Sequence, residues 1–133
     1  MIFAWDIDVP AATPVSNPVE KILKLHRGVI VKVYIKFPAG CHGLVGVRIY
    51  RWGQQLIPLN RDDWLTGDDE TVPCEIYYPL ETHPYELKFI AVSPLCTYDH
   101  KITVRVIILN KFLAYPYLII DRFINLFKRI FGA

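Results

Sequence analysis

The sequence predicts an all-β fold, an antiparallel β-sandwich of immunoglobulin-like or jelly-roll type with about seven strands. Three observations lead to this prediction. Apolar and polar residues alternate in short runs between residues 19 and 109, turn-forming residues separate these runs, and no helical periodicity occurs among them. The length of 133 residues suits one domain with terminal extensions.

Three stretches predict strands most clearly, because apolar side chains occupy every second position. They are residues 29–37, 45–50 and 101–108. In the first of them, the residues expected to face the core are Val29, Val31, Val33, Ile35 and Phe37. Four weaker stretches, bounded by Gly, Pro or acidic residues, complete the sandwich. They are residues 19–26, 54–58, 72–78 and 85–92.

Residues 1–18 predict an extended N-terminal arm outside a sandwich domain at residues 19–110. Pro10, Pro14 and Pro18 disfavour a helix or a central strand in this segment. Its apolar side chains are expected to pack on the parent domain or on a neighbouring subunit. The partner-binding residues predicted in the arm are Ile2, Phe3 and Trp5.

The C-terminal segment, residues 111–133, predicts an amphipathic helix. Between residues 117 and 131 the polar side chains recur at spacings that place them in one stripe at about 100° per residue. The apolar residues cover roughly two thirds of the circumference, so the parent sandwich can cover only part of them and another chain or a lipid surface is implied. The longest uncharged apolar run, residues 112–120, is too short for a membrane span of about 20 residues. The partner-binding residues predicted in the helix are Ile120, Phe123, Ile124, Phe127, Ile130 and Phe131.

Composition and charge narrow the function classes. Hydrophobic residues make up 53% and charged residues 21%, which excludes intrinsic disorder. Fifteen Lys and Arg against thirteen Asp and Glu give a net charge of +2, too little for a dedicated nucleic-acid-binding surface. Cys41, Cys74 and Cys96 show no zinc-ligand spacing and are expected to be buried reduced thiols, with one disulfide left as the alternative.

No motif predicts a catalytic residue, a metal site or a cofactor. Five carboxylates between residues 61 and 70 fit a solvated loop, with bound calcium as the alternative. The four histidines lack metal-ligand spacing. Asp99 and His100 closely follow Cys96, but neighbours on a strand point to opposite faces and cannot act together. The segment 40–43 is interpreted as a hairpin loop rather than a phosphate-binding loop, because no helix follows it.

Two tryptophans suggest sugar binding as an alternative function. Trp52 lies next to a glycine and Trp64 lies inside the acidic segment, so both are candidates for an aromatic platform that binds sugars. The competing interpretation is that they cap the open ends of the sandwich core.

The stretches 37–47 (FPAGCHGLVGV), 55–58 (QLIP) and 98–104 (YDHKITV) resemble small β-sandwich structural proteins of tailed phages. The resemblance covers residues 19–109 and implies a capsid-associated or tail-associated subunit without catalytic residues. The sequence therefore predicts a non-enzymatic structural subunit of a virion, which binds copies of itself and another structural protein but no nucleic acid or small molecule. The alternatives are a peripheral membrane protein anchored by the C-terminal helix and a carbohydrate-binding module.

Overall fold

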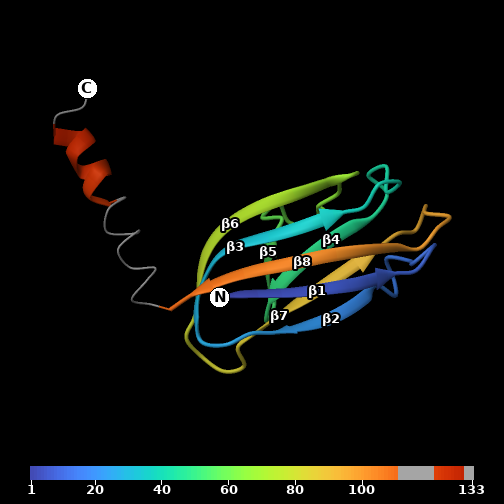
Figure 1. The fold of residues 1–133 in the computed structure, drawn as a ribbon, viewed down its shortest axis with the longest axis horizontal. Helices are drawn as coiled ribbons and strands as arrows, with labels where there is room; N and C mark the ends of the chain where they lie inside the picture. Colours follow the sequence, from blue (N-terminus) through green and yellow to red (C-terminus); the bar gives the residue numbers. More distant parts are fainter. Residues whose placement is uncertain (111–121, 131–133) are drawn as a thin grey trace.

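The computed structural model describes residues 1–110 and 122–130, which contain two four-stranded antiparallel sheets packed face to face (Figure 1). Sheet A contains, in spatial order, β1 (Ile2–Val9), β8 (His100–Leu109), β3 (Gly28–Phe37) and β6 (Glu70–Leu80). Sheet B contains β2 (Val19–Lys24), β7 (Glu86–Val92), β4 (Gly46–Arg51) and β5 (Gln54–Ile57). A helix at residues 122–130 follows the sandwich. The described residues confirm the predicted all-β sandwich, with eight strands in place of about seven.

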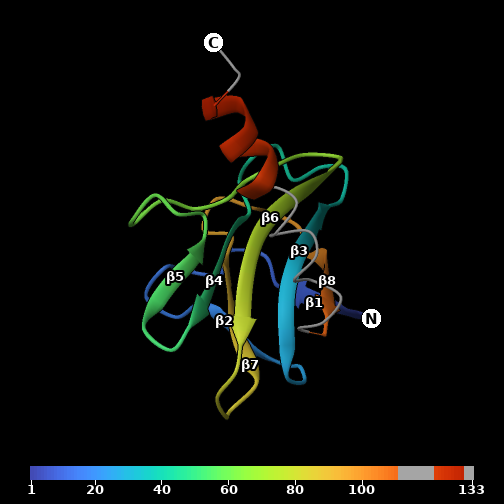
Figure 2. The same cartoon turned by 90° about the vertical axis from the view of Figure 1, so that its left-hand side faces the viewer.

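The strand order is that of a jelly roll. β1 pairs with β8, β2 with β7, β3 with β6 and β4 with β5, so the chain runs as one long hairpin that is rolled into two sheets. Eight strands wound in this way form the two Greek keys of a jelly roll, and the order differs from that of an immunoglobulin sandwich. Figure 2 shows β4 and β5 of sheet B to one side of β3 and β6 of sheet A.

Within residues 1–110, the turn between β4 and β5 is the one connection that joins two successive strands of the same sheet. The predicted hairpin at residues 40–43 is therefore wrong. These residues belong to the connection 38–45, which leads from β3 in sheet A to β4 in sheet B. Alternation identifies each segment as a strand, but it does not say which strand is the partner.

The core lies between the inner faces of the two sheets and draws on all eight strands. Its largest fully buried side chains include Phe37, Phe89, Leu23, Ile30, Ile35 and Ile49. Fully burying one such side chain stabilises the fold by about 1.5–3 kcal/mol relative to leaving it in water. No described residue of the helix is buried, so the core is formed without it.

All seven predicted strands are present. β6 (Glu70–Leu80) is longer than the predicted 72–78, and the alternation in β3 differs from the predicted one. β6 lies at a sheet edge, where Pro73 and Pro79 are tolerated although they cannot donate ladder hydrogen bonds. In β3 a bulge between Ile30 and Lys32 shifts the alternation by one residue. Ile30 is fully buried while Val31 is only partly buried, so the predicted core position of Val31 is wrong.

The predicted N-terminal arm is wrong for residues 2–9, which form β1 at one edge of sheet A. β1 pairs with β8 over its whole length, and Ile7 and Val9 belong to the core. The physical reason is visible in the sequence, because from Phe3 to Val9 inward apolar residues alternate with outward polar or small ones. The sandwich domain therefore begins at Ile2 rather than at residue 19, and the Pro-rich residues 10–18 form the connection to β2.

The two ends of the sandwich differ in their connections. The long connections at one end are 10–18, 38–45, 58–69 and 93–99, and the short ones at the other end are 25–27, 52–53 and 81–85 (Figure 1). We call these the loop end and the short-turn end. β8 finishes at the short-turn end (Figure 1). Loops held on a rigid scaffold are where binding residues concentrate, so the loop end is the first place to look for a site.

Candidate functional site

Hydrogen bonds join the four connections of the loop end into two pairs. The first pair consists of the β1–β2 and β7–β8 connections. The Ala12 N–H donates to the Cys96 carbonyl at 3.0 Å, and the Ala11 N–H donates to the Asp99 carboxylate at 2.7 Å. The buried Ser93 hydroxyl adds a 2.7 Å bond to the Pro10 carbonyl. These bonds fix the Pro-rich connection, which contributes no regular strand pairing of its own.

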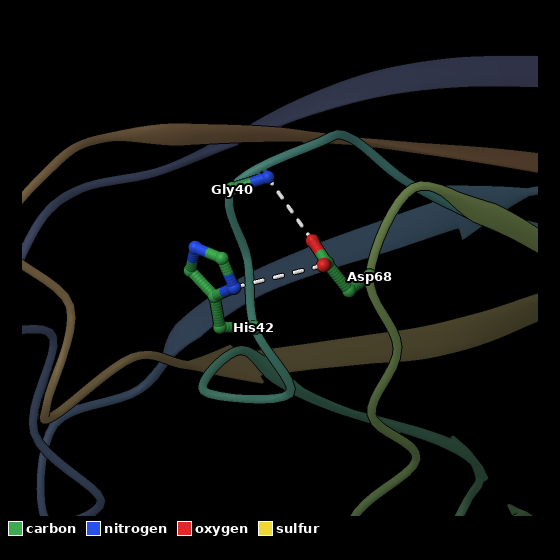
Figure 3. Close-up of polar contacts among 3 residues, drawn as sticks. All are labelled: Gly40, His42 and Asp68. Carbon is green, nitrogen blue, oxygen red and sulfur yellow. Dashed lines mark hydrogen bonds and ion pairs between the residues drawn. The ribbon is translucent and has the colours of Figure 1, made fainter.

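The second pair consists of the β3–β4 and β5–β6 connections and is held by Asp68 (Figure 3). One carboxylate oxygen of Asp68 accepts the Gly40 N–H at 3.0 Å, and the other lies 3.7 Å from His42 Nδ1. Hydrogen bonds from the backbone N–H groups of His42 and Gly40, together with the nearby imidazole, lower the pKa of Asp68. The carboxylate is therefore the charged clamp that ties these two connections together.

A cavity of about 440 Å³ lies between the two pairs of connections. The β3–β4 connection contributes Leu44 and His42, while Leu95, Tyr98 and Asp99 come from the β7–β8 connection. Leu95 is 74% exposed and Tyr98 is 76% exposed, so large apolar surface stands at the rim. Sequence reasoning missed this site, because only the jelly-roll topology brings the two connections together.

The cavity also brings together residues that were expected to face apart. Asp99 and His100 both line it, because Asp99 precedes β8 and strand alternation does not apply to it. The expectation of opposite faces is therefore wrong for this pair. Cys96 is buried beside them, and burial raises the pKa of its thiol. A protonated thiol at neutral pH is a poor nucleophile, so the arrangement does not favour covalent catalysis.

The three cysteines are free thiols. Cys41 is fully buried, and burial, followed by the neighbouring Cys96 and Asp68, raises the pKa of its thiol to about 11. Across residues 1–110 and 122–130, no group of three or more His, Cys, Asp or Glu side chains could hold a metal ion. The carboxylates of the acidic segment 61–70 are exposed, as a solvated loop requires.

The two candidate sugar-binding tryptophans do not share a surface. Trp64 packs on the outer face of sheet B against Gly46, and the Arg48 guanidinium covers its ring at 3.8 Å from the centroid. Trp52 lies at the β4–β5 turn at the short-turn end, 62% exposed, with the Arg51 guanidinium 4.3 Å from its ring centroid. They lie near opposite ends of β4, and each is paired with a different arginine, so they form no common platform.

The partner-binding residues predicted at the N-terminus divide into two groups. Phe3 and Trp5 are partly buried and stack on each other with ring centroids 5.9 Å apart, and the Phe3 ring also meets His26 at 5.3 Å. These contacts are made within the chain. Ile2 faces outward and is 68% exposed. It is the one residue of the three with most of its surface in solvent.

The helix at residues 122–130 exposes every one of its described side chains. The predicted partner-binding residues here are Phe123, Ile124, Phe127 and Ile130, which are 46–66% exposed, and Leu126 joins them. At about 100° per residue these five occupy one side of the helix, while Arg122, Asn125, Lys128 and Arg129 occupy the other. Ile120 and Phe131 lie outside the described residues. Among the described residues no helix has the length and hydropathy to cross a membrane.

No family model and no curated protein matches the chain. Among solved structures, the crystal structure of FlhE is similar, with a TM-score of 0.32 and 16% sequence identity over 80% of this chain and 95% of that chain. At this TM-score the similarity carries no argument, and the functional conclusion depends on the chain's own surfaces.

Proposed function

We propose that the protein is a non-enzymatic structural subunit that joins a symmetric assembly through its C-terminal helix. The observation that carries the proposal is the apolar side of the helix, where five large side chains are 46–66% exposed and none belongs to the core that the described residues form. Burying an aliphatic or Phe side chain is worth about 1.5–3 kcal/mol. Covering this face with another chain therefore supplies several kcal/mol for association.

The assembly we propose is a tailed-phage particle, in which the chain serves as a capsid-associated or tail-associated subunit. The resemblance of residues 19–109 to such proteins supports this proposal, and jelly-roll domains are recurrent building blocks of viral capsids. The fold alone does not choose a function, because lectins and cupins share it. The exposed helix is the feature that favours an assembly over a freely diffusing binding module.

The test is the molar mass in solution, measured by light scattering after size exclusion in detergent-free buffer. Phe123 and Ile130 are seven residues apart and lie on the same side of the helix, with 66% and 64% of their surface exposed. We expect Phe123→Asp with Ile130→Asp to reduce the wild-type oligomer to a monomer. Asn125→Gln is the control, because it changes the polar side of the same helix without changing its charge and should leave the mass unchanged.

Adding liposomes distinguishes this proposal from the alternative of a peripheral membrane protein. The described helix carries three cations and no carboxylate, a charge that also suits anionic lipid headgroups. A wild-type protein that is monomeric in buffer and is recovered with anionic vesicles is a peripheral membrane protein and contradicts the proposal. An oligomer of the same mass with and without vesicles supports it.

A further inference from the structure

We propose that the helix of one copy docks on the loop end of the next copy, so that subunits associate head to tail. This inference rests on the proposed function and names the surface that receives the helix. Its two halves are the helix at residues 122–130 and the cavity between the β3–β4 and β7–β8 connections.

Charge complementarity is the first argument. The four connections of the loop end contain one arginine, Arg61, and five aspartates, which gives a net charge of −4 with histidine neutral. The aspartates are Asp62, Asp63, Asp68, Asp69 and Asp99. The helix carries Arg122, Lys128 and Arg129 and no carboxylate, a net charge of +3. Surfaces of opposite charge accelerate encounter and fix orientation. The negative loop end of a second copy therefore attracts the positive helix.

Apolar complementarity is the second argument. The cavity of about 440 Å³ has the size of a ligand pocket, and Leu44, Leu95 and Tyr98 on its lining leave much of their surface in solvent. Phe123 and Ile130 stand on the apolar side of the helix with more than half of their surface exposed. An aromatic anchor that fills a pocket is the arrangement in which a few residues provide most of the binding energy.

A second hollow, on the outer face of sheet A, fits the helix less well. It measures about 230 Å³ and is lined by Ile2, Tyr34, Thr71, Arg105 and Ile107. Among the described residues that line it, Arg105 is the charged one, and it repels the cations of the helix. The loop end is larger and has the opposite charge, so it is the preferred receptor.

The positions of the two halves determine the symmetry. The loop end lies at one end of the sandwich, and β8 leads the chain out at the other (Figure 1). A contact between two different surfaces is heterologous, and it produces a closed ring when the rotation closes and a filament when it does not. The inference therefore excludes an isologous dimer built on helix–helix contact.

Mixing two variants tests the inference. The helix variant carries Phe123→Asp and Ile130→Asp, and the loop variant carries Leu95→Asp and Tyr98→Asp, both at exposed positions that leave the core intact. We expect each variant alone to be monomeric. Their mixture should form a 1:1 complex and nothing larger. The loop variant provides the intact helix, the helix variant provides the intact loop end, and no further pair of intact surfaces remains. Ile22→Asp is the control, since Ile22 is exposed on the outer face of β2 and its replacement should leave the oligomer intact.

Each outcome separates the two proposals. A helix variant that keeps the oligomeric mass contradicts the proposed function. If the helix variant is monomeric but the loop variant keeps the wild-type oligomeric mass, head-to-tail docking is contradicted. The proposed function is then still supported. Two monomeric variants that do not associate when mixed also contradict head-to-tail docking. Arg122→Glu with Arg129→Glu should weaken association about tenfold, and an unchanged affinity removes the charge argument.

Discussion

The two terminal segments of the described chain are both rich in large apolar side chains, yet the sandwich incorporates only one of them. β1 alternates with a period of two and lies along β8, so its backbone is hydrogen-bonded while Ile7 and Val9 enter the core. The helix at residues 122–130 pairs backbone groups within itself, so it does not add a strand to a sheet edge. Apolar terminal residues therefore indicate a partner only when their periodicity does not match a free edge of the same domain.

The largest expected effect comes from equal truncations in the two regions. Phe89 is fully buried between the sheets, and Phe89→Ala should lower the free energy of unfolding by about 3–5 kcal/mol because a cavity remains. Phe123→Ala on the exposed helix should change it by less than about 0.5 kcal/mol. Urea unfolding at low protein concentration, where association contributes least, measures both. A comparable loss at the two positions contradicts the division between a packed sandwich and an exposed helix.

A second test compares the same substitution, Ile→Ala, at an inward and an outward position of β1. Ile7 faces the core with 6% of its surface exposed, and Ile2 faces outward with 68% exposed. Ile7→Ala should cost about 2–4 kcal/mol in urea unfolding, whereas Ile2→Ala should cost less than about 0.5 kcal/mol. If the two variants are equally stable, β1 is not an integral strand and the arm predicted from the prolines is restored.

These tests bear on how far the sequence predicts the structure. Seven strands and the sandwich follow from the alternation of apolar and polar residues. β1 shows the same alternation in Phe3, Trp5 and Ile7, but the neighbouring prolines predict an extended arm there. The bulge at Val31 depends on how β3 meets both of its neighbours, so no local pattern contains it. The cavity at the loop end depends on strand order, because residues 38–45 and 93–99 meet only after the hairpin has been rolled into two sheets.

A third test uses pH to sharpen the comparison. The pKa of Cys41 is raised to about 11 from the ordinary value of 9.0, chiefly by burial. A raised folded-state pKa contributes stability that is fully present below pH 9 and is lost as pH rises toward 11. At pH 10 the wild type should lose about 1 kcal/mol more, relative to pH 8, than Cys41→Ala does. Urea unfolding of both proteins at the two pH values measures this difference, and parallel losses contradict a buried, unpaired thiol.

The smallest expected effect concerns the exposed helix as a whole. Ending the chain after Asn110 removes the helix, and none of the described residues that it removes belongs to the core. The free energy of unfolding should therefore stay within about 0.5 kcal/mol of that of the full-length chain carrying Phe123→Asp and Ile130→Asp. This comparison uses two proteins that are both expected to be monomeric, so mass action does not enter. A loss of several kcal/mol would mean that residues after Asn110 other than Phe123 and Ile130 stabilise the sandwich, and the C-terminal segment would then be part of the fold.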